Sequence, residues 1–223
     1  MAETTVPRRT RRRRQPLTRE RVLRAALTLA DERGIEAVSM RKLGEALGVE
    51  AMSLYKHVAG KEDVLDGIAD LVMGEFEVPA AGEDWRAAVR RGAISAHRAL
   101  LRHPWAGSVI ESRLKPGPAR LRYLDAVVGA MRAAGFDLAT VGRAFLALDS
   151  HTYGFTLQEL AWPFDQERAP EMAAVAARMF EGAYPNLLAM AELAASSPTG
   201  VPVEFEFGLD MLLDGLERLR ERG

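Results

Sequence analysis

The sequence has 223 residues, enough for one or two domains with a hydrophobic core, and its abundance of alanine, leucine, arginine and glutamate favours helix over sheet. It contains no cysteine, which excludes structural disulfides, thiolate metal ligands and cysteine nucleophiles. The net charge of −1 hides an asymmetry, because the first 61 residues hold 14 Lys and Arg against 7 Asp and Glu, whereas the remaining residues hold 16 against 24. This division suggests a polyanionic partner at one end of the chain only.

The chain begins with a basic arm. Six of the first 14 residues are arginines and the segment offers almost nothing to bury, so we expect residues 1–16 to be disordered when the protein is free. Two roles remain open for this arm. It contacts DNA phosphates, or it is a solvated tail that never touches DNA.

A first helix is predicted over about residues 18–33. Thr18 has the side chain of an N-cap, and Gly34 ends the run of apolar residues at helical spacing. The apolar positions of this helix are Val22, Leu23, Ala26, Leu27 and Ala30.

Two shorter helices follow. Ser39 is a second N-cap, and Gly48 stands where a left-handed residue ends a helix of about two turns. The segment 51–57 is again helical in character, with Leu54 and Val58 as its inward-facing residues.

Two short helices joined by a glycine-containing turn, with a first helix behind them, predict a helix-turn-helix domain in residues 17–63. In that geometry the second short helix enters the major groove, where base pairs are distinguishable. Lys61 and the N-terminus of its helix provide a further phosphate anchor. A three-helix packing module with a solvated polar face is the alternative. The side chains left to meet phosphates and base edges are Ser53, Tyr55, Lys56 and His57.

The remainder of the chain, residues 64–223, is predicted to form a larger helical domain. A helix that begins at Lys61 and carries apolar residues as far as Phe76 links it to the head. No strand-like alternation occurs, so we predict an all-α fold. Further amphipathic helices are expected near 84–102, 118–134, 137–161, 169–183 and 203–221.

The segment from Ser39 to Val49, followed by Ser53 to Val58 and Lys61, resembles the DNA-binding head of tetracycline-repressor (TetR) family regulators. The resemblance implies a dimeric repressor whose C-terminal domain binds a small molecule and thereby reorients the DNA-binding heads. The body resembles the tetracycline-repressor branch of the family in Leu101–Pro104, Ala134–Phe136, Thr152–Gly154 with Glu159, and Phe205–Leu209.

The resemblance also implies which residues contact DNA. Ala51, Met52 and Lys56 differ from the residues of the tetracycline repressor itself, so the operator sequence does not carry over. The predicted DNA-binding residues are Arg41, Ser53, Tyr55, Lys56, His57 and Lys61, all but Lys56 at DNA-contacting positions of the family.

An effector site is predicted in the body, where Phe145, Asp149 and Thr152 follow helical spacing and place polar groups in an apolar pocket. Ordinary core is the alternative for each of these residues. Ile110 occupies the position of a histidine that holds the magnesium-bound drug in the tetracycline repressor, so we expect a small apolar or amphipathic effector instead of a metal-chelated tetracycline. The other predicted walls are Ile110, Leu124, Val127, Met131 and Met179.

The four histidines are far apart in the sequence and lack metal-ligand spacing, so we predict no metal and no cofactor. His97 and His103 flank a helix end, where histidines commonly interact with carbonyl groups, and a structural role is favoured. For His151, contact with an effector and a hydrogen-bonded interior position are both open.

The last helix carries an apolar face too broad for a helix covered on one side only. The family resemblance assigns this helix, together with 137–161, to a four-helix dimer interface. An internal core helix is the alternative. The face consists of Phe205, Leu209, Leu212, Leu213, Leu216 and Leu219.

Catalysis has little support, since the sequence has no phosphate-binding glycine loop, no metalloprotease helix and no serine in a nucleophile elbow. No apolar run is long enough to cross a bilayer, and the arginine-rich N-terminal segment lacks the apolar stretch that a signal peptide needs, so we expect a cytoplasmic location. The leading interpretation is a non-enzymatic transcriptional repressor that binds a palindromic operator as a homodimer and is released by a small molecule. The alternative is a helical small-molecule-binding protein or enzyme without DNA binding.

Overall fold

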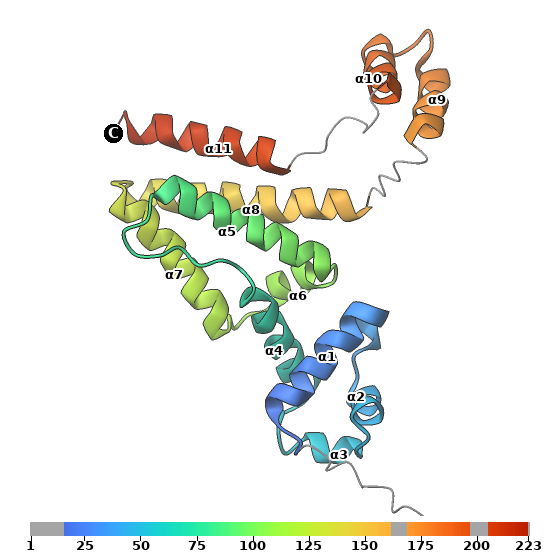
Figure 1. Cartoon of the computed structure of the whole chain (residues 1–223), viewed down its shortest axis with the longest axis vertical. Coiled ribbons are helices and arrows are strands. Elements are labelled where there is room, and N and C mark those ends of the chain that lie inside the picture. The colour runs from blue at the N-terminus through green and yellow to red at the C-terminus, as the bar shows by residue number, and fades with distance from the viewer. Residues whose placement is uncertain (1–15, 162–168, 197–204, 223) are drawn as a thin grey trace, which may run out of the picture. The chain divides into compact units, whose positions relative to one another are not determined.

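The structure is a computed structural model, and it describes residues 16–161, 169–196 and 205–222. Within these ranges it contains eleven α-helices, one short 3-10 helix and no strand, which confirms the all-α prediction (Figure 1). The chain divides into two compact units, residues 1–68 and residues 69–223. We refer to them as the head and the body. All of the predicted basic arm except Pro16 lies outside the described residues.

The head consists of three helices, a 3-10 turn and the beginning of a fourth helix. The predicted first and second helices are confirmed to within a residue or two. In chain order the elements are α1 (Arg19–Arg33), η1 (Ile35–Ala37), α2 (Met40–Leu47), α3 (Ala51–Leu54) and α4 (Lys61–Met73), which continues across the boundary into the body.

Side-chain caps fix where the first two helices begin. The Thr18 hydroxyl accepts the Arg21 amide hydrogen at 3.2 Å, and the Ser39 hydroxyl accepts that of Lys42 at 3.3 Å. Gly48 follows α2 with φ +66° and ψ +36°, a left-handed conformation that glycine adopts at little cost. The caps predicted at Thr18, Ser39 and Gly48 are therefore all present.

The core of the head joins every one of its helices. Leu43 of α2 and Leu54 of α3 are fully buried, as predicted for Leu54, and Val58 is 3% exposed. Burial of this kind stabilises a small domain by about 1.5–3 kcal/mol for each large apolar side chain. The other fully buried apolar residues of the head are Val22, Ala26, Val64 and Ile68.

In the described residues, seven helices and the end of α4 build the body. Neither α6 nor α10 was expected from the sequence, whereas the five predicted body helices are present. They are α5 (Trp85–Arg102), α6 (Ala106–Ser112), α7 (Pro118–Ala133), α8 (Leu138–Ala161), α9 (Ala169–Phe180), α10 (Pro185–Ser196) and α11 (Phe205–Arg220).

Four of the body helices pack around one hydrophobic core. Helix α5 contacts α7, α8 and α11, and α8 also contacts α7 and α11, whereas α9 and α10 pair with each other. Figure 1 shows α11 running alongside α8 and α5. No helix in the described part of the chain is long and apolar enough to cross a membrane. The core includes Trp85, Val127, Met131, Phe136, Val141, Leu148, Phe205, Leu209 and Leu213.

Candidate DNA interface and effector cavity

The segment after α2 is held tightly against it. A Cβ atom on Gly44 would lie 2.9 Å from the Val49 carbonyl oxygen and 3.1 Å from the Ala51 backbone nitrogen, so only glycine fits without moving the backbone. The close approach fixes α3 relative to α2. This is the geometry of a helix-turn-helix.

Helix α3 is shorter than predicted, because it ends at Leu54 and the residues up to His57 form a turn. Tyr55 has ψ −11°, where the backbone tightens, and the Val58 amide still donates to the Leu54 carbonyl at 3.1 Å. The turn therefore keeps one helical i, i+4 hydrogen bond and places Val58 in the core. Residues 55–57 remain on the outside of the head.

The predicted DNA-contacting side chains lie on the surface of the head to different degrees. Tyr55 is 49% exposed, although a large aromatic side chain is more often buried. Arg41 forms an exposed ion pair with Glu45 at 2.9 Å, so DNA would have to compete with a weak surface pair for its guanidinium. Of the six predicted residues, Arg41, Tyr55, Lys56 and Lys61 are exposed, and Ser53 and His57 are partly exposed.

Met52 belongs to the same surface, although its role was not predicted from the sequence. It is 73% exposed on α3, three residues before Tyr55, so both side chains lie on one side of the segment. An exposed apolar side chain beside polar ones can contact the methyl group of thymine. Its i, i+3 spacing from Tyr55 is the sequence feature that could have predicted this position.

A bidentate ion pair ties the start of α1 to the start of α4. The Arg19 guanidinium donates to both carboxylate oxygens of Asp63, at 2.7 and 2.6 Å, and the Ala59 amide donates to Asp63 at 2.8 Å. The Arg19 hydrogen bonds lower the pKa of the Asp63 carboxyl. The pair therefore holds the N-terminus of α4, where Lys61 lies, against α1.

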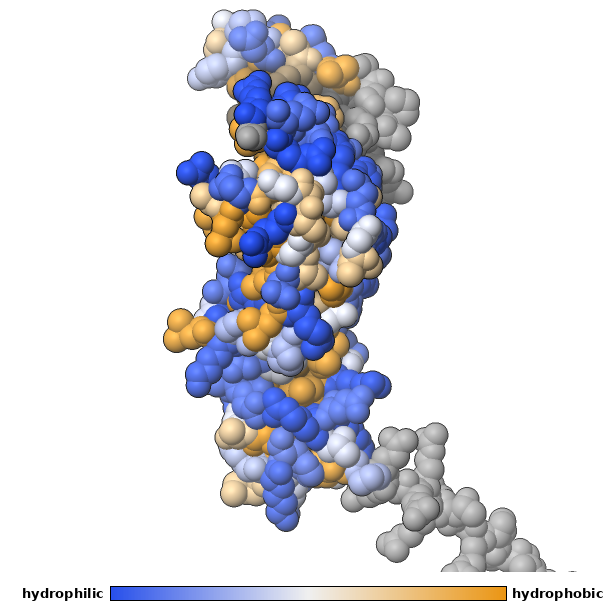
Figure 2. Space-filling model, turned by 90° about the vertical axis from the view of Figure 1, so that its left-hand side faces the viewer, coloured by the Kyte–Doolittle hydropathy of each residue, from blue (hydrophilic) through white to orange (hydrophobic). Residues whose placement is uncertain are grey.

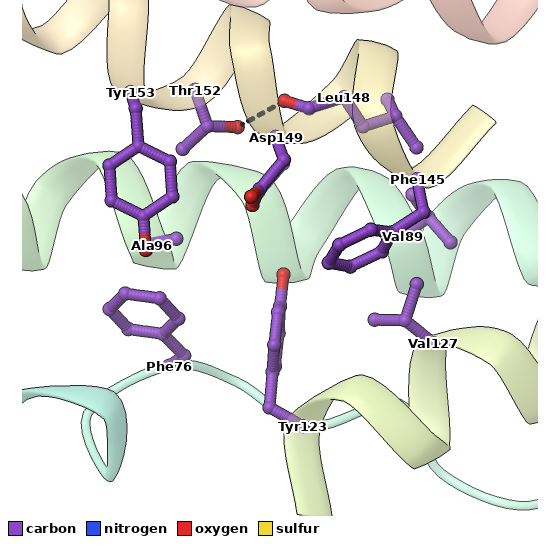
Figure 3. A pocket seen from close by; sticks show the side chains of 11 residues that line it. Phe76, Val89, Ala96, Tyr123, Val127, Phe145, Leu148, Asp149, Thr152 and Tyr153 are labelled. Atoms are coloured by element: carbon purple, nitrogen blue, oxygen red, sulfur yellow. Dashed lines mark hydrogen bonds between the residues drawn. The ribbon is translucent and has the colours of Figure 1, made fainter. Parts of the chain in front are cut away.

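The body encloses a cavity between α5, α7 and α8 (Figure 3). Its volume is about 30 Å³, room for roughly two water molecules. Most of the wall is aromatic or aliphatic, and the polar groups are one carboxyl, two phenols and one hydroxyl. The lining residues are Phe76, Val89, Ala93, Ala96, Tyr123, Val127, Phe145, Leu148, Asp149, Thr152 and Tyr153.

Four of the eight predicted effector residues line this cavity, namely Val127, Phe145, Asp149 and Thr152. The other four do not. Ile110 is 1% exposed in α6, Leu124 is partly buried beside the lining residue Tyr123, Met131 is fully buried in the core, and Met179 is 70% exposed on α9.

The polar groups of the cavity have few partners. Burial is the main cause that raises the pKa of the Asp149 carboxyl to about 6, with a further contribution from the charge of Glu111. Burial likewise raises the pKa values of the Tyr123 and Tyr153 phenols. The Thr152 hydroxyl instead donates to the Leu148 carbonyl at 2.8 Å. Asp149 is therefore the group of the cavity whose charge responds near neutral pH.

Two of the histidines, far apart in the sequence, come together in the structure. The His97 and His151 rings both stack on Phe205, with centroids 4.2 and 4.9 Å from its ring. The chain therefore brings α5, α8 and α11 together at one aromatic cluster. No group of three or more metal-ligating side chains occurs in the described ranges.

The hydrogen bonds of these histidines are structural. His97 Nδ1 lies 2.8 Å from the Thr156 hydroxyl, and His151 Nε2 donates to the Phe205 carbonyl at 2.9 Å, which supports the interior alternative for His151. Nε2 of His103 lies 3.1 Å from a Glu75 carboxylate oxygen. The partners of His97 and His103 in these contacts are side chains, where helix-end carbonyls were expected.

Helix α11 has two apolar faces. Phe205, Leu209, Leu213 and Leu216 are buried in the body, so the core alternative accounts for much of the predicted face. Three apolar residues at i, i+4 and i+12 on another side of the helix are exposed, and only Leu219 among them belonged to the predicted face. These residues are Phe207, Met211 and Leu219, 66%, 59% and 53% exposed, and α8 adds Leu146 and Leu157, each 67% exposed.

Exposed apolar residues are common on this chain. The face drawn in Figure 2 carries hydrophobic side chains in several patches among charged ones. A helix-turn-helix with a polar outer segment and a helical body with a mostly apolar cavity that carries four polar groups are typical of one class of protein. This class is the DNA-binding regulators with a small-molecule sensor.

Comparison with known proteins agrees with this class. The family model described as bacterial regulatory proteins, tetR family, matches residues 22–68, and the model described as tetracyclin repressor-like, C-terminal domain, matches residues 78–220. An HTH-type transcriptional regulator of Saccharopolyspora erythraea is 37% identical over 173 residues, 77% of this chain and 73% of the relative. The class A tetracycline repressor from transposon 1721 of Escherichia coli is 32% identical over 203 residues, 89% of this chain and 90% of the repressor.

A solved structure is similar over nearly the whole chain. The crystal structure of the TetR family protein ActR of Streptomyces coelicolor, in complex with actinorhodin, has a TM-score of 0.72 and 26% identity and covers 92% of this chain and 99% of ActR. The chain described here belongs to the tetR family of bacterial regulatory proteins. It is a ligand-responsive, DNA-binding transcriptional repressor.

Proposed function

We propose that the protein binds a two-fold symmetric operator as a homodimer, and that a small molecule bound in the body cavity releases it from DNA. The observation that carries the DNA-binding part is the outward position of Tyr55 directly after the fully buried Leu54. The buried Leu54 fixes the backbone, so the exposed Tyr55 side chain is held in place on the surface where it can contact a partner. We assign the contacts to Arg41, Ser53, Tyr55, Lys56, His57 and Lys61, with Met52 as an apolar addition.

We propose that the exposed apolar face of α11 packs against a second copy of the chain. Phe207, Met211 and Leu219 expose apolar side chains on one side of this helix, while its other side is already buried in the body. Two-fold pairing would bring α8 and α11 of each copy together, and it would repeat the recognition segment. Met211→Glu should shift the protein to monomers in sedimentation velocity, whereas Met190→Glu, at an equally exposed methionine of α10, should not.

The cavity is the place we propose for the effector. ActR, a protein of similar fold, is known in complex with actinorhodin, and the class A repressor is named for tetracycline. A space of about 30 Å³ admits no organic molecule unless its walls move. Effector binding would therefore shift α5, α7 or α8, which gives the ligand a direct effect on the conformation of the body. We further propose that the chain acts by binding and not by catalysis.

Selection of bound fragments from random DNA tests this function. We expect a palindromic site whose half-site centres are separated by about one helical turn, roughly 34–36 Å, or by a multiple of that length. Saturable binding that weakens with salt would exclude the alternative of a helical protein without DNA binding. Tight binding of one monomer to a single half-site would contradict the homodimer.

A further inference from the structure

The Asp149 carboxyl lies in the cavity without a partner. No described residue donates a hydrogen bond to it or forms an ion pair with it, although it lines a mostly apolar space. Figure 3 shows the carboxyl of Asp149 and the hydroxyl of Tyr123 pointing toward each other across the cavity. Asp149 is only partly buried, but a carboxylate in a mostly apolar cavity without protein donors is still disfavoured, so the site gains most from an occupant that supplies them.

The neighbouring cation is already engaged elsewhere. Arg120 lowers the pKa of Asp149 through its charge, but its guanidinium donates to the Ile110 carbonyl at 2.7 Å and pairs with Glu111 at 3.0 Å. Glu111 adds a second negative charge near the cavity. The local field therefore favours a cation and disfavours an anionic ligand.

The walls of the cavity suit the apolar part of such a ligand. Phe76, Tyr123, Phe145 and Tyr153 present four aromatic rings around the carboxyl (Figure 3). Aromatic faces attract ammonium groups and pack against planar rings. Neither phenol has a hydrogen-bond partner among the described residues, so both hydroxyls remain available to orient a polar substituent.

We propose that the effector is an organic cation in which a protonated amine adjoins an aromatic ring system, and that the Asp149 carboxylate receives this amine inside the cavity between α5, α7 and α8. The inference rests on the proposed function, in which this cavity is the effector site. An amine supplies both a positive charge and N–H donors, and a charge-assisted hydrogen bond is roughly twice as strong as a neutral one. A hydroxyl in its place supplies a single neutral donor.

Matched compounds that differ only in charge test the proposal. The panel contains an arylmethylamine, the corresponding alcohol and the corresponding carboxylate, each with benzene, naphthalene and anthracene as the ring. Affinities are measured by calorimetry on the full-length protein without DNA. We expect the best amine to bind at least about tenfold more tightly than its alcohol, and the carboxylate to bind most weakly.

Two variants test whether the difference in affinity between amine and alcohol depends on Asp149. Asp149→Asn keeps the shape of the side chain and removes its charge, so the difference between amine and alcohol should disappear. Asp125→Asn removes an exposed carboxylate of α7 outside the cavity and should leave the difference unchanged. Thermal melting checks both variants, and Asp149→Asn should be at least as stable as the parent protein because it removes a charge that burial disfavours.

The proposal is overturned if no amine of the panel binds, if the alcohol binds as tightly as the amine, or if Asp149→Asn keeps the preference. Release of operator DNA by the best amine is measured separately. An amine that binds through Asp149 but leaves the DNA complex intact contradicts the proposed function of the cavity, and not the ligand class. Failure of the protein to bind any selected DNA contradicts the proposed function alone.

Discussion

The head and the body place their functional groups in opposite ways. In the head the groups assigned to DNA lie on the outer surface, and the core behind them is closed by fully buried residues such as Leu43 and Leu54. In the body the assigned groups face inward, around a cavity of about 30 Å³. An outer surface can bind a rigid polyanion without rearrangement, whereas a cavity of this size can bind an organic molecule only if its walls move.

This difference separates recognition of DNA by the head from the response of the body to a ligand. A substitution on the outer surface of the head should change affinity for DNA and little else. A substitution in the cavity should change ligand binding and, through the packing of α5, α7 and α8, the conformation of the body. The following experiments test that separation, beginning with the largest expected effect.

Removal of residues 1–14 should have the largest effect on DNA binding. Each phosphate neutralised contributes roughly 0.9 to the slope of log affinity against log salt concentration. If three arginines of each subunit meet phosphates, a dimer neutralises six, and the deletion should flatten the slope by about five units. Raising the salt from roughly 50 to 200 mM should therefore weaken DNA binding by the full chain about a thousandfold more than binding by the deleted protein. Fluorescence anisotropy measures both affinities.

The deleted protein must still fold and keep its oligomeric state, as judged by circular dichroism and sedimentation. Its affinity for the best ligand of the body should equal that of the full chain. A slope that does not change would show that the arm is a solvated tail, which was the alternative drawn from the sequence.

Gly44→Ala should reduce operator affinity by about a hundredfold. The new methyl group would lie 2.9 Å from the Val49 carbonyl oxygen, and backbone atoms can make room only if α3 moves away from α2. Overpacking of this kind costs about 1–3 kcal/mol. Gly129→Ala in α7 is the matched control, because no atom lies within 4 Å of its added Cβ. It should stabilise the body by about 0.5–1 kcal/mol and leave DNA binding intact.

Tyr55→Ala should weaken operator binding by roughly tenfold, the effect of losing one contact worth about 1–2 kcal/mol. Because the side chain is 49% exposed, the melting temperature should change little. Leu54→Ala, one residue earlier and fully buried, should instead cost about 2–5 kcal/mol of stability. A large loss of melting temperature in Tyr55→Ala would place the phenol in the core and contradict its assignment to DNA.

The head could be predicted from the sequence because its signals are local. The Thr18 and Ser39 caps, the left-handed Gly48 and the inward Leu54 each act within a few residues, and each is present in the structure. Only the end of α3 was misplaced. A helical pattern does not reveal that the backbone tightens at Tyr55 to bury Val58.

The cavity depends on how several helices face one another, and periodicity along a single helix fixes only part of that arrangement. On α8 the spacing of Phe145, Asp149 and Thr152 sufficed, because all three face the neighbouring helices. On α7 the prediction named Leu124, whereas its neighbour Tyr123 lines the cavity. Met131 belongs to the core layer near Trp85 and Phe136, whose mutual contact is not visible in the sequence.

The pH dependence of amine binding is the smallest expected effect, and it sharpens the contrast between the two regions. The pKa of Asp149 is about 6 in the protein without ligand, above its ordinary value of 3.8, because burial disfavours the charge. A protonated amine binds the ionised carboxylate, so its affinity should be nearly constant between pH 7 and 8 and fall by about fourfold between pH 7.5 and 5.5, as protons occupy the carboxylate. The groups whose charges act on or face Asp149 are Glu111, Arg120, Tyr123 and Tyr153.

The neutral alcohol of the same ring should bind equally at both pH values, and Asp149→Asn should remove the dependence for the amine. A fall that persists in Asp149→Asn would assign the titration to another group. An amine affinity that stays constant down to pH 5.5 would show that its binding does not depend on the charge of Asp149. In that case the carboxyl would be only a part of the cavity wall, and the body would select its ligand by shape.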